Sequence, residues 1–200
     1  MLLSSLDDAE LAIVGSRGRG GFGRLMLGSV SHQLSIHSPR PTIIVPPNSP
    51  SSALRRVVIG VDGSDNSKAA LRWIHAFAPL DCELVAVHAW EPAGAGLPGL
   101  GADTYQLLSE ASETQFNTAI SEVEGELGEP NRFTKVFETG HPGGVLADQA
   151  ADADLVVVGA SGHRGALGTV LGSTTNWVIH HLSCPAAVVP DMTATSTEPQ

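Results

Sequence analysis

Four small residues near the end of the chain have types and spacing that suit a phosphate group. Gly159 and Gly162 are separated by two residues, and the pair Gly172-Ser173 follows after nine more. Gly159 ends an apolar run, where a Cβ would crowd a ligand, and Gly162 can adopt a positive φ in a turn. Gly172-Ser173 opens a predicted helix, whose unpaired N–H groups and positive dipole end stabilise an anion. The pattern therefore predicts an anion site built largely from backbone.

The same residues are also compatible with a segment that binds nothing. The glycines would then only form tight turns, and Ser173 would be an ordinary N-cap. No Gly-Lys-Ser/Thr follows, so the pattern is not a Walker A loop, and it is not the Gly-x-Gly-x-x-Gly of dinucleotide-binding folds. His180 and His181 end a predicted helix, where a positive charge complements the helix dipole, and they lack a third ligand at metal-binding spacing. No nucleophilic triad can be argued from residue order.

Strands alternate with helices around these residues. A short β-branched run predicts a strand over 56–61, and further strands are predicted over 83–90, 132–138, 155–158 and 186–189. Apolar stripes at helical spacing predict helices over 65–78, 103–127, 142–151 and 173–182. Asp65-Asn66-Ser67 offers N-cap side chains for the first of these helices. The alternation predicts a parallel sheet covered by helices on both faces, in which ligands bind at the carboxyl ends of strands where the strand order reverses.

Part of this unit occurs twice in the chain. Residues 8–15 match 152–159, and residues 41–46 match 185–190, both at an offset of 144 positions. The sequence therefore predicts the C-terminal fragment of a first domain at 1–46, a linker at 47–54, a complete domain at 55–190 and a disordered tail at 191–200. Because Met1 aligns with Val145, we expect the first copy to be truncated.

Composition excludes several classes of function. Eleven basic side chains against 21 acidic ones give a formal charge of -10, which argues against a duplex-wide grip on nucleic acid. Cys82 and Cys184 lack the spacing of a disulfide framework or a zinc site, so a reducing cytoplasm fits best. No apolar run reaches the roughly 18 residues that a membrane span requires. We expect a cytoplasmic protein without membrane or nucleic-acid partners.

Several motifs together resemble the universal stress protein family, in its ATP-binding branch. They are the Gly-x2-Gly-x9-Gly-Ser spacing, the run Gly60-Val61-Asp62-Gly63-Ser64, the strand end Val87-His88-Ala89 and the closing run 184–190. The resemblance covers all of 56–190 and the fragment at 1–46. It implies an α/β fold of the adenine nucleotide alpha hydrolase type, with five parallel strands in the order 3-2-1-4-5, helices on both faces and a partial copy of the same fold. It also implies dimerisation through the last strand.

The resemblance implies ATP at the carboxyl ends of the first and fourth strands, with magnesium entering only with the nucleotide and no metal ligand from the protein. The implied nucleotide-binding residues are Val61, Asp62, Gly63, Ser64, Ala89, Val158, Gly159, Gly162, Gly172, Ser173 and Thr174. His163 and Arg164 would either reach a phosphate from their loop or remain in solvent. Asp62 could alternatively be a turn residue or helix cap without a ligand. Gly15, Gly18, Gly28 and Ser29 would form an incomplete second site that has no partner for Asp62.

The last strands of the two copies are expected to pair with each other. Thr42–Val45 should pair with Ala186–Val189, either within one chain as a pseudo-dimer or between two chains as a homodimer. The fragment has no first strand, so we expect Leu11–Val14 to have an exposed apolar edge that favours instability or self-association.

A regulatory module of the stress response, switched by bound ATP, is the leading hypothesis for function. Hydrolysis would be slow at most, because no lysine or pair of carboxylates is visible for the γ-phosphate. One alternative is a nucleotide hydrolase or ATP-dependent transferase that uses Asp62 or His163. The other is an interaction module that has kept the fold and binds no nucleotide, which fits the fragment better than the complete copy.

Overall fold

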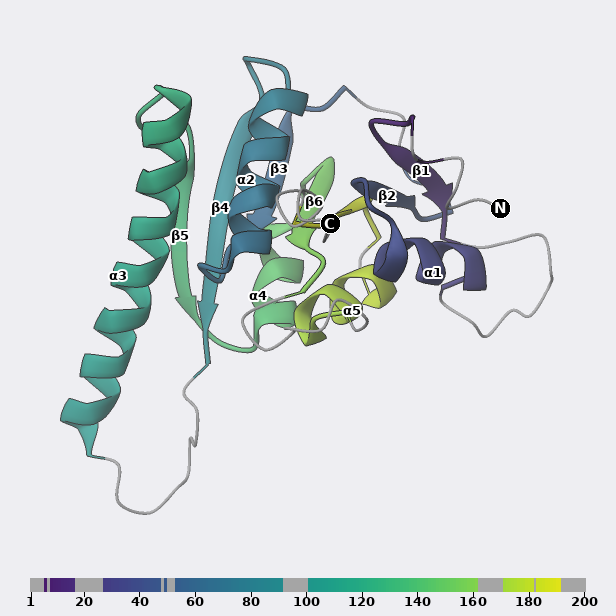
Figure 1. Ribbon diagram of the computed structural model, residues 1–200. Coiled ribbons are helices and arrows are strands. Elements are labelled where there is room, and N and C mark those ends of the chain that lie inside the picture. Colours follow the sequence, from purple (N-terminus) through teal and green to yellow (C-terminus); the bar gives the residue numbers. More distant parts are fainter. Residues whose placement is uncertain are drawn as a thin grey trace, which may run out of the picture.

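A single mixed β-sheet organises the part of the chain that the computed structural model describes, which comprises residues 6, 8–16, 27–47, 49, 53–91, 101–161, 171–181 and 183–191. The strand order is β1-β2-β7-β6-β3-β4-β5 (Figure 1). The strands are β1 (Ala12–Gly15), β2 (Thr42–Val45), β3 (Arg56–Gly60), β4 (Glu83–Trp90), β5 (Thr134–Thr139), β6 (Leu155–Gly159) and β7 (Ala186–Val189). The helices in the described residues are α1 (Ser29–His37), α2 (Asp65–Phe77), α3 (Ala102–Leu127), α4 (Pro142–Gln149) and α5 (Ser173–His181).

The five strands β3 to β7 have the expected topology. Their order across the sheet is β5-β4-β3-β6-β7, and every neighbouring pair is parallel. Numbered within this unit, the order is 3-2-1-4-5, so the prediction is confirmed. β4 and β7 begin and end at the predicted residues, whereas β5 begins two residues later, at Thr134. The N-cap of α2 is Ser64, not one of the residues 65–67, because the chain already turns into the helix at Asp65.

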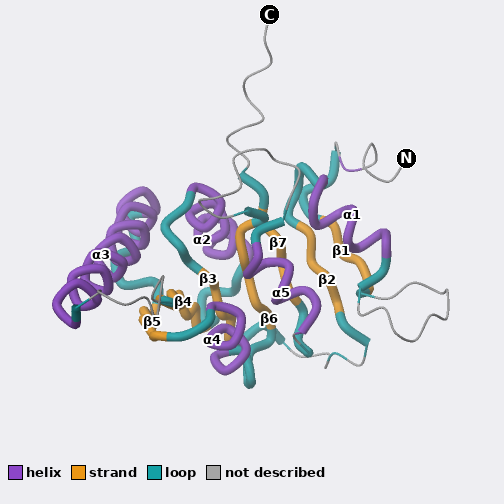
Figure 2. Tube along the Cα trace, turned by 90° about the horizontal axis from the view of Figure 1, so that it is seen from below, coloured by secondary structure: helices purple, strands orange, loops and turns teal. Residues whose placement is uncertain are grey.

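Two apolar layers hold the helices onto the sheet (Figure 2). On one face, α2 and α3 contribute Leu71, Ile74, Phe116 and Ile120 to a cluster that includes Ile59 of the central strand. On the opposite face, α4 and α5 supply the helical side chains of a second cluster, which includes Leu146 and Val178. Both faces of β3 are therefore buried, and its continuous apolar sequence follows from this burial.

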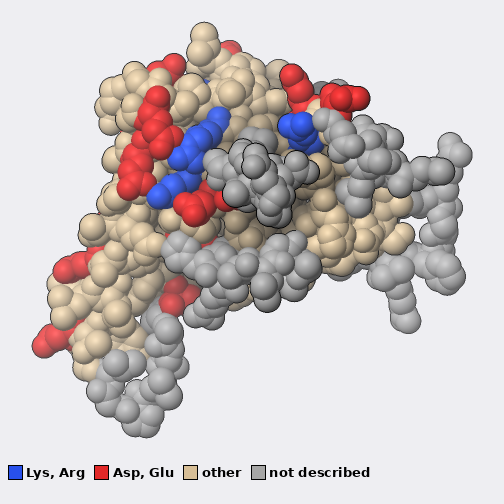
Figure 3. Space-filling view, in the orientation of Figure 1, with Lys and Arg blue, Asp and Glu red and all other residues tan. Residues whose placement is uncertain are grey.

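A row of ion pairs joins α2 to α3. Figure 3 shows basic side chains beside a column of acidic ones over these two helices. Lys68 Nζ lies 2.6 Å from Glu122, and Arg72 Nε lies 2.6 Å from Glu126. The hydrogen bond from Arg72 lowers the pKa of Glu126 below its ordinary value. Because these carboxylates are exposed, the pairs orient α3 along α2 more than they stabilise the fold.

The segment β1–α1–β2 has the same internal register as β6–α5–β7. Ala12 pairs with Thr42 in β1 and β2, and Val156 pairs with Ala186 in β6 and β7. Each of these positions differs from its counterpart by 144, and the agreement continues to the ends of both strand pairs. The two segments therefore share one β–α–β geometry.

The hydrogen bonds after each strand repeat in the same way. Ser16 N–H donates to the Val45 carbonyl and Ala160 N–H to the Val189 carbonyl, each at 2.8 Å. The next bond along, from Gly28 N–H to the Ser16 carbonyl, corresponds to the bond from Gly172 N–H to the Ala160 carbonyl. The repeat seen in the letters of the sequence is thus also a repeat of backbone contacts.

β2 pairs with β7 in antiparallel orientation, within one chain. Ile43 lies opposite Ala187, which is its own counterpart 144 positions later, and Thr42 lies opposite Val188 while Ile44 lies opposite Ala186. A pairing that is symmetric under this exchange has local two-fold symmetry, as the interface of a symmetric dimer does. The expected pairing of 42–45 with 186–189 is confirmed in its intrachain form.

β1 lies at the edge of the sheet, as expected for residues 11–14. β1 pairs with β2 on one side only within the described residues. Ile13 is 64% exposed. Gly18 and its neighbours in 17–26 lie outside the described residues, as do residues 192–200 of the predicted tail.

Close contact between α4 and α5 depends on one glycine. An added Cβ at Gly143 would lie 2.4 Å from Cδ2 of Trp177, whereas an added Cβ at Gly144 would meet no atom within 4 Å. The Trp177 ring is also stacked on His181, with centroids 4.4 Å apart. The indole therefore has little room to yield to a side chain at position 143.

We predict that Gly143→Ala lowers the free energy of unfolding by about 1–3 kcal/mol, because overpacking forces ring and backbone to shift. Gly144→Ala is the matched control, since it makes the same chemical change one position later. It should raise the free energy of unfolding by about 0.5–1 kcal/mol through reduced chain entropy. Urea denaturation followed by circular dichroism measures both changes. Equal effects of the two variants would contradict the proposed close packing.

Candidate functional site

A hollow with convergent polar groups lies at the carboxyl ends of the central strands. Its volume is about 820 Å³, within the range of small-molecule sites. β3 and β6 are neighbours at the point where the order of the sheet reverses, so their following loops diverge to opposite faces. The described lining consists of Gly60, Val61, Asp62, Ser64, Ser67, Val87, His88, Ala89, Trp90, Glu91, Pro142, Leu146, Val158, Gly159, Ser161, Leu171, Gly172, Ser173, Thr174 and Thr175.

Most of the site residues expected from the sequence meet around this cavity. The expected residues that line it are Val61, Asp62, Ser64, Ala89, Val158, Gly159, Gly172, Ser173 and Thr174. Gly63 is not part of the described lining. It has a φ of +81°, and an added Cβ there would lie 2.8 Å from Nε2 of Gln115, so the turn requires a glycine. Gly162, His163 and Arg164 lie outside the described residues.

Three helices begin at this cavity. The N-cap of α2, the first residue of α4 and the first turn of α5 contribute Ser64, Pro142 and Ser173 to the lining. Helix N-termini carry partial positive charge and N–H groups without intrahelical acceptors. Among the described lining residues the charged side chains are Asp62 and Glu91, and none is basic. Within the described part of the cavity, the groups that can stabilise an anion are therefore the backbone N–H groups at these helix N-termini.

Asp62 and Ser64 shape the turn between β3 and α2. Oδ1 of Asp62 accepts hydrogen bonds from the Ser64 N–H at 3.0 Å and from the Ser64 hydroxyl at 2.5 Å. The Ser64 oxygen in turn accepts a hydrogen bond from the Ser67 N–H and caps the helix. Oδ2 of Asp62 has no hydrogen-bond partner among the described residues. This exposed carboxylate is both a turn residue and an available acceptor.

Two of the lining glycines also have structural roles that the sequence did not predict. An added Cβ at Gly159 would lie 2.8 Å from Cβ of Asn66 and 2.9 Å from its carbonyl carbon, so the close approach of α2 to β6 itself requires glycine. The Gly172 N–H donates to the Ala160 carbonyl at 3.1 Å and is therefore already engaged. The N–H groups that can face an anion at α5 are those of residues 173–175.

His88 also lines the cavity, and its ring is held on both sides. Its Nδ1 lies 2.7 Å from the Val61 carbonyl, and its Nε2 lies 2.9 Å from Oγ of Ser112. A carbonyl can only accept, so Nδ1 carries a hydrogen, and in the neutral ring Nε2 accepts from the Ser112 hydroxyl. The ring lies between Phe116 and Phe137, with centroids 5.5 and 5.4 Å away. Both ring nitrogens therefore have partners, and the ring ties the turn after β3 to α3.

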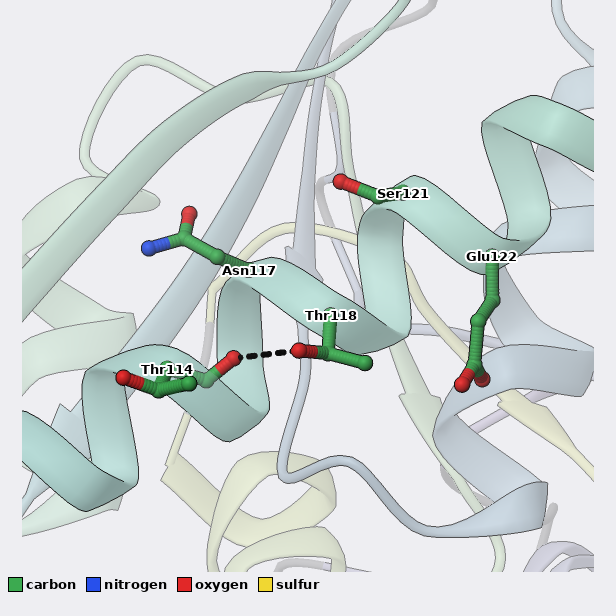
Figure 4. A pocket seen from close by; sticks show the side chains of 5 residues that line it. All are labelled: Thr114, Asn117, Thr118, Ser121 and Glu122. Atoms are coloured by element: carbon green, nitrogen blue, oxygen red, sulfur yellow. Dashed lines mark hydrogen bonds between the residues drawn. The ribbon is translucent and has the colours of Figure 1, made fainter.

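A second hollow lies along α3 (Figure 4). Its described lining is Thr114, Asn117, Thr118, Ser121 and Glu122. All of these side chains come from one helix, so they form one wall rather than a convergent set. Thr118 donates to the Thr114 carbonyl and Glu122 binds Lys68, which engages part of the polar capacity. The cavity at the strand ends is the better candidate site.

Two glycines of the N-terminal segment are placed like Gly159 and Gly172, but no turn like that at Asp62 lies beside them in the described residues. Gly15 ends β1 and Gly28 is the N-cap of α1, which begins at Ser29. The described residues contain no counterpart of Asp62 beside them. They also contain no group of three or more His, Cys, Asp or Glu side chains that could hold a metal ion.

We predict that Ser112→Ala lowers the free energy of unfolding by about 1 kcal/mol, because it leaves Nε2 of His88 without its donor. Ser121→Ala is the control, since it makes the same exchange at an exposed position of the same helix and the helix propensities cancel. Its expected effect is within about 0.5 kcal/mol of zero. Thermal unfolding of both variants tests this difference. Loss of the difference in a His88→Leu background would tie it to the histidine, and its persistence there would refute the assignment.

The comparisons with known proteins give a consistent result. The model of the Universal stress protein family matches residues 4–46 and 53–190. The chain is 33% identical over 198 residues to universal stress protein Rv2005c of Mycobacterium tuberculosis, with 91% of this chain and 62% of that protein covered. It is 30% identical over 193 residues to a universal stress protein of Mycolicibacterium smegmatis, covering 94% of this chain and 64% of that protein.

Solved structures with low sequence identity have the same fold. The crystal structure of a universal stress protein from Archaeoglobus fulgidus matches with a TM-score of 0.67 at 22% identity, over 95% of this chain and 65% of that one. The chain thus spans less than two thirds of the length of these relatives. None of the helices in the described ranges has the length and apolar composition needed to cross a membrane.

Proposed function

Since the chain belongs to the universal stress protein family, we propose that it binds ATP in the cavity at the carboxyl ends of β3 and β6. Bound nucleotide would make the protein a regulatory module of the stress response. The observation that supports this best is the convergence of three helix N-termini on one cavity. Such an arrangement stabilises a multiply charged anion without basic side chains.

The triphosphate would lie at the first turn of α5. The N–H groups of residues 173–175 have no intrahelical acceptors there. Ser173 and Thr174 add hydroxyl groups to the lining of the cavity. The hydroxyl of Thr175 donates instead to the Gly159 carbonyl, at 2.6 Å, and fixes the helix to the end of β6. Phosphate binding thus falls to backbone and to two hydroxyls on a rigid helix.

The adenine and ribose would lie at the opposite end, beside β3 and β4. Val61, Ala89 and Val158 present apolar surface and backbone groups there, which suits a flat base. Asp62 has one carboxylate oxygen outside the turn, and that oxygen can accept hydrogen bonds from ribose hydroxyls. His88 would position the Val61 carbonyl without touching the phosphates.

Binding without rapid turnover fits this lining. No lysine, arginine or pair of adjacent carboxylates lies among the described lining residues, so transition-state charge on a γ-phosphate would be poorly stabilised. Asp62 and Glu91 are the described carboxylates of the cavity, and a magnesium ion would enter with the nucleotide rather than bind first. We therefore propose nucleotide occupancy, and not hydrolysis, as the regulated quantity.

We further propose that the chain contains one complete domain, residues 55–190, and the C-terminal part of another, residues 1–46, joined by a linker at 47–54. The shared register at an offset of 144 and the two-fold pairing of β2 with β7 support this division. One nucleotide per chain is then expected, because the partial domain has no counterpart of Asp62.

We predict that Asp62→Ala weakens ATP binding by about 10-fold to 100-fold, the size of lost hydrogen bonds to a charged acceptor. Asp65→Ala removes the same charge three residues away, outside the described lining, and should change affinity less than about threefold. Isothermal titration calorimetry with magnesium and ATP compares both variants with the unaltered chain. Equal affinities of the two variants would contradict the assigned role.

The phosphate contacts have their own test. Adenosine should bind at least about tenfold more weakly than ATP, because it cannot use the N-terminus of α5. The same calorimetric titration measures it. Equal affinity for adenosine and ATP would place the phosphates in solvent and contradict the proposed orientation.

A further inference from the structure

The N-terminal part of α3 extends beyond the rest of the fold. In Figure 1 this end of the helix passes the ends of β4 and β5. The buried residues of α3 begin at Phe116, so none of the residues 102–111 is buried. The N-cap, Gly101, makes no side-chain hydrogen bond to the first turn. This part of the helix therefore receives little of the tertiary packing that stabilises most helices in proteins.

Four exposed side chains form a leucine stripe on this part of α3. Leu107 is 66% exposed and Leu108 is 48% exposed, and Thr104 and Ala111 are exposed as well. The four positions have the spacing i, i+3, i+4 and i+7, which places them on one side of a helix. At 3.6 residues per turn, Leu107 lies on the side opposite Phe116, which packs in the core. The leucine stripe is thus an apolar surface that the described fold leaves uncovered.

The charges beside the leucine stripe have a single sign. Residues three and four positions apart are neighbours on a helix, so Asp103 and Glu110 lie beside Leu107. α3 contains no lysine or arginine to offset these carboxylates. Figure 3 shows acidic and no basic side chains at this end of the helix. An apolar stripe with an acidic border is the result.

The acidic border decides which occupant fits the leucine stripe. A second copy of the stripe would bring Asp103 and Glu110 close to the same carboxylates, and like charges repel. An anionic lipid surface or a nucleic acid would be repelled for the same reason. A partner with cationic side chains beside apolar ones complements both the stripe and its border.

We propose that residues 103–111 of α3 form a docking surface for a basic amphipathic helix of a partner protein. Leu107 and Leu108 would pack among apolar side chains of the partner, as helix faces do when they associate. Lysine or arginine side chains next to them would face Asp103 and Glu110. The described lining of the nucleotide cavity includes no residue of α3, so the docking surface is separate from that site. It also lies at the opposite end of the sheet from β1 (Figures 1 and 2).

The test uses the whole chain and a fluorescent synthetic helix with leucine on one face and lysine on the other. Its counterpart has glutamate in place of every lysine. Fluorescence anisotropy should show saturable binding of the lysine peptide, with an affinity about tenfold or more above that of the glutamate peptide. Absence of saturable binding, or equal binding of the two peptides, overturns the proposal.

Variants of the chain locate the contact. Leu107→Gln should weaken binding of the lysine peptide about tenfold, because it removes an apolar anchor. Leu80→Gln is the matched control, since Leu80 is 91% exposed outside α3, and it should change the affinity less than about twofold. Glu110→Gln should weaken binding about threefold, and Asp81→Asn, which removes the same charge beside Leu80, should not. Equal effects within either pair overturn the proposal.

Two further measurements identify the occupant and its place. The lysine peptide should slow amide hydrogen exchange across residues 102–111 and leave α5 unchanged, and protection elsewhere without protection of 102–111 overturns the proposal. Sedimentation of the chain without peptide tests the second copy. Self-association that Leu107→Gln abolishes would identify a second copy as the occupant and overturn the proposal. Because no nucleotide is present, these results are independent of ATP binding at the cavity.

Discussion

The parallel pairing of β3 with β6 is the interaction on which the candidate site depends. The connection after β3 passes over one face of the sheet through α2, and the connection after β6 passes over the other through α5. The two loops must therefore separate, and the space between them is a cavity that the N-termini of α2, α4 and α5 border. The meeting of helix N-termini at this cavity is a consequence of topology, because a helix that follows a parallel strand begins at this edge.

The antiparallel pairing of β2 with β7 determines which strand lies at this edge of the sheet. β2 occupies the outer edge of β7, so the edge that the family resemblance assigned to a dimer contact is satisfied within the chain. The cost of this arrangement appears at β1, where an apolar edge and Ile13 remain exposed. Both features follow from the β–α–β geometry that β1–α1–β2 and β6–α5–β7 share, because within the described residues only β6 has a further strand, β3, on its other side.

Sequence patterns predicted the elements well because their causes are local. The strands predicted over 83–90 and 186–189 match the observed bounds of β4 and β7, and the offset of 144 anticipated the repeated register. The causes at the site are less local. Gly159 was expected to make room for a ligand, and the contact with Asn66 requires a glycine there as well, but this contact exists only after α2 crosses to β6. His88 and Leu146 reach the cavity through strand order and helix crossing, and no spacing in the sequence signals that.

The central claim is that a nucleotide binds where β3 and β6 diverge, and a crystal structure of the chain grown with ATP and magnesium tests it most directly. The account predicts one nucleotide per chain, with adenine beside Val61 and Ala89 and with phosphates at the first turn of α5. Density for ATP along α3, or an empty cavity at the strand ends in crystals soaked to saturation, would contradict it.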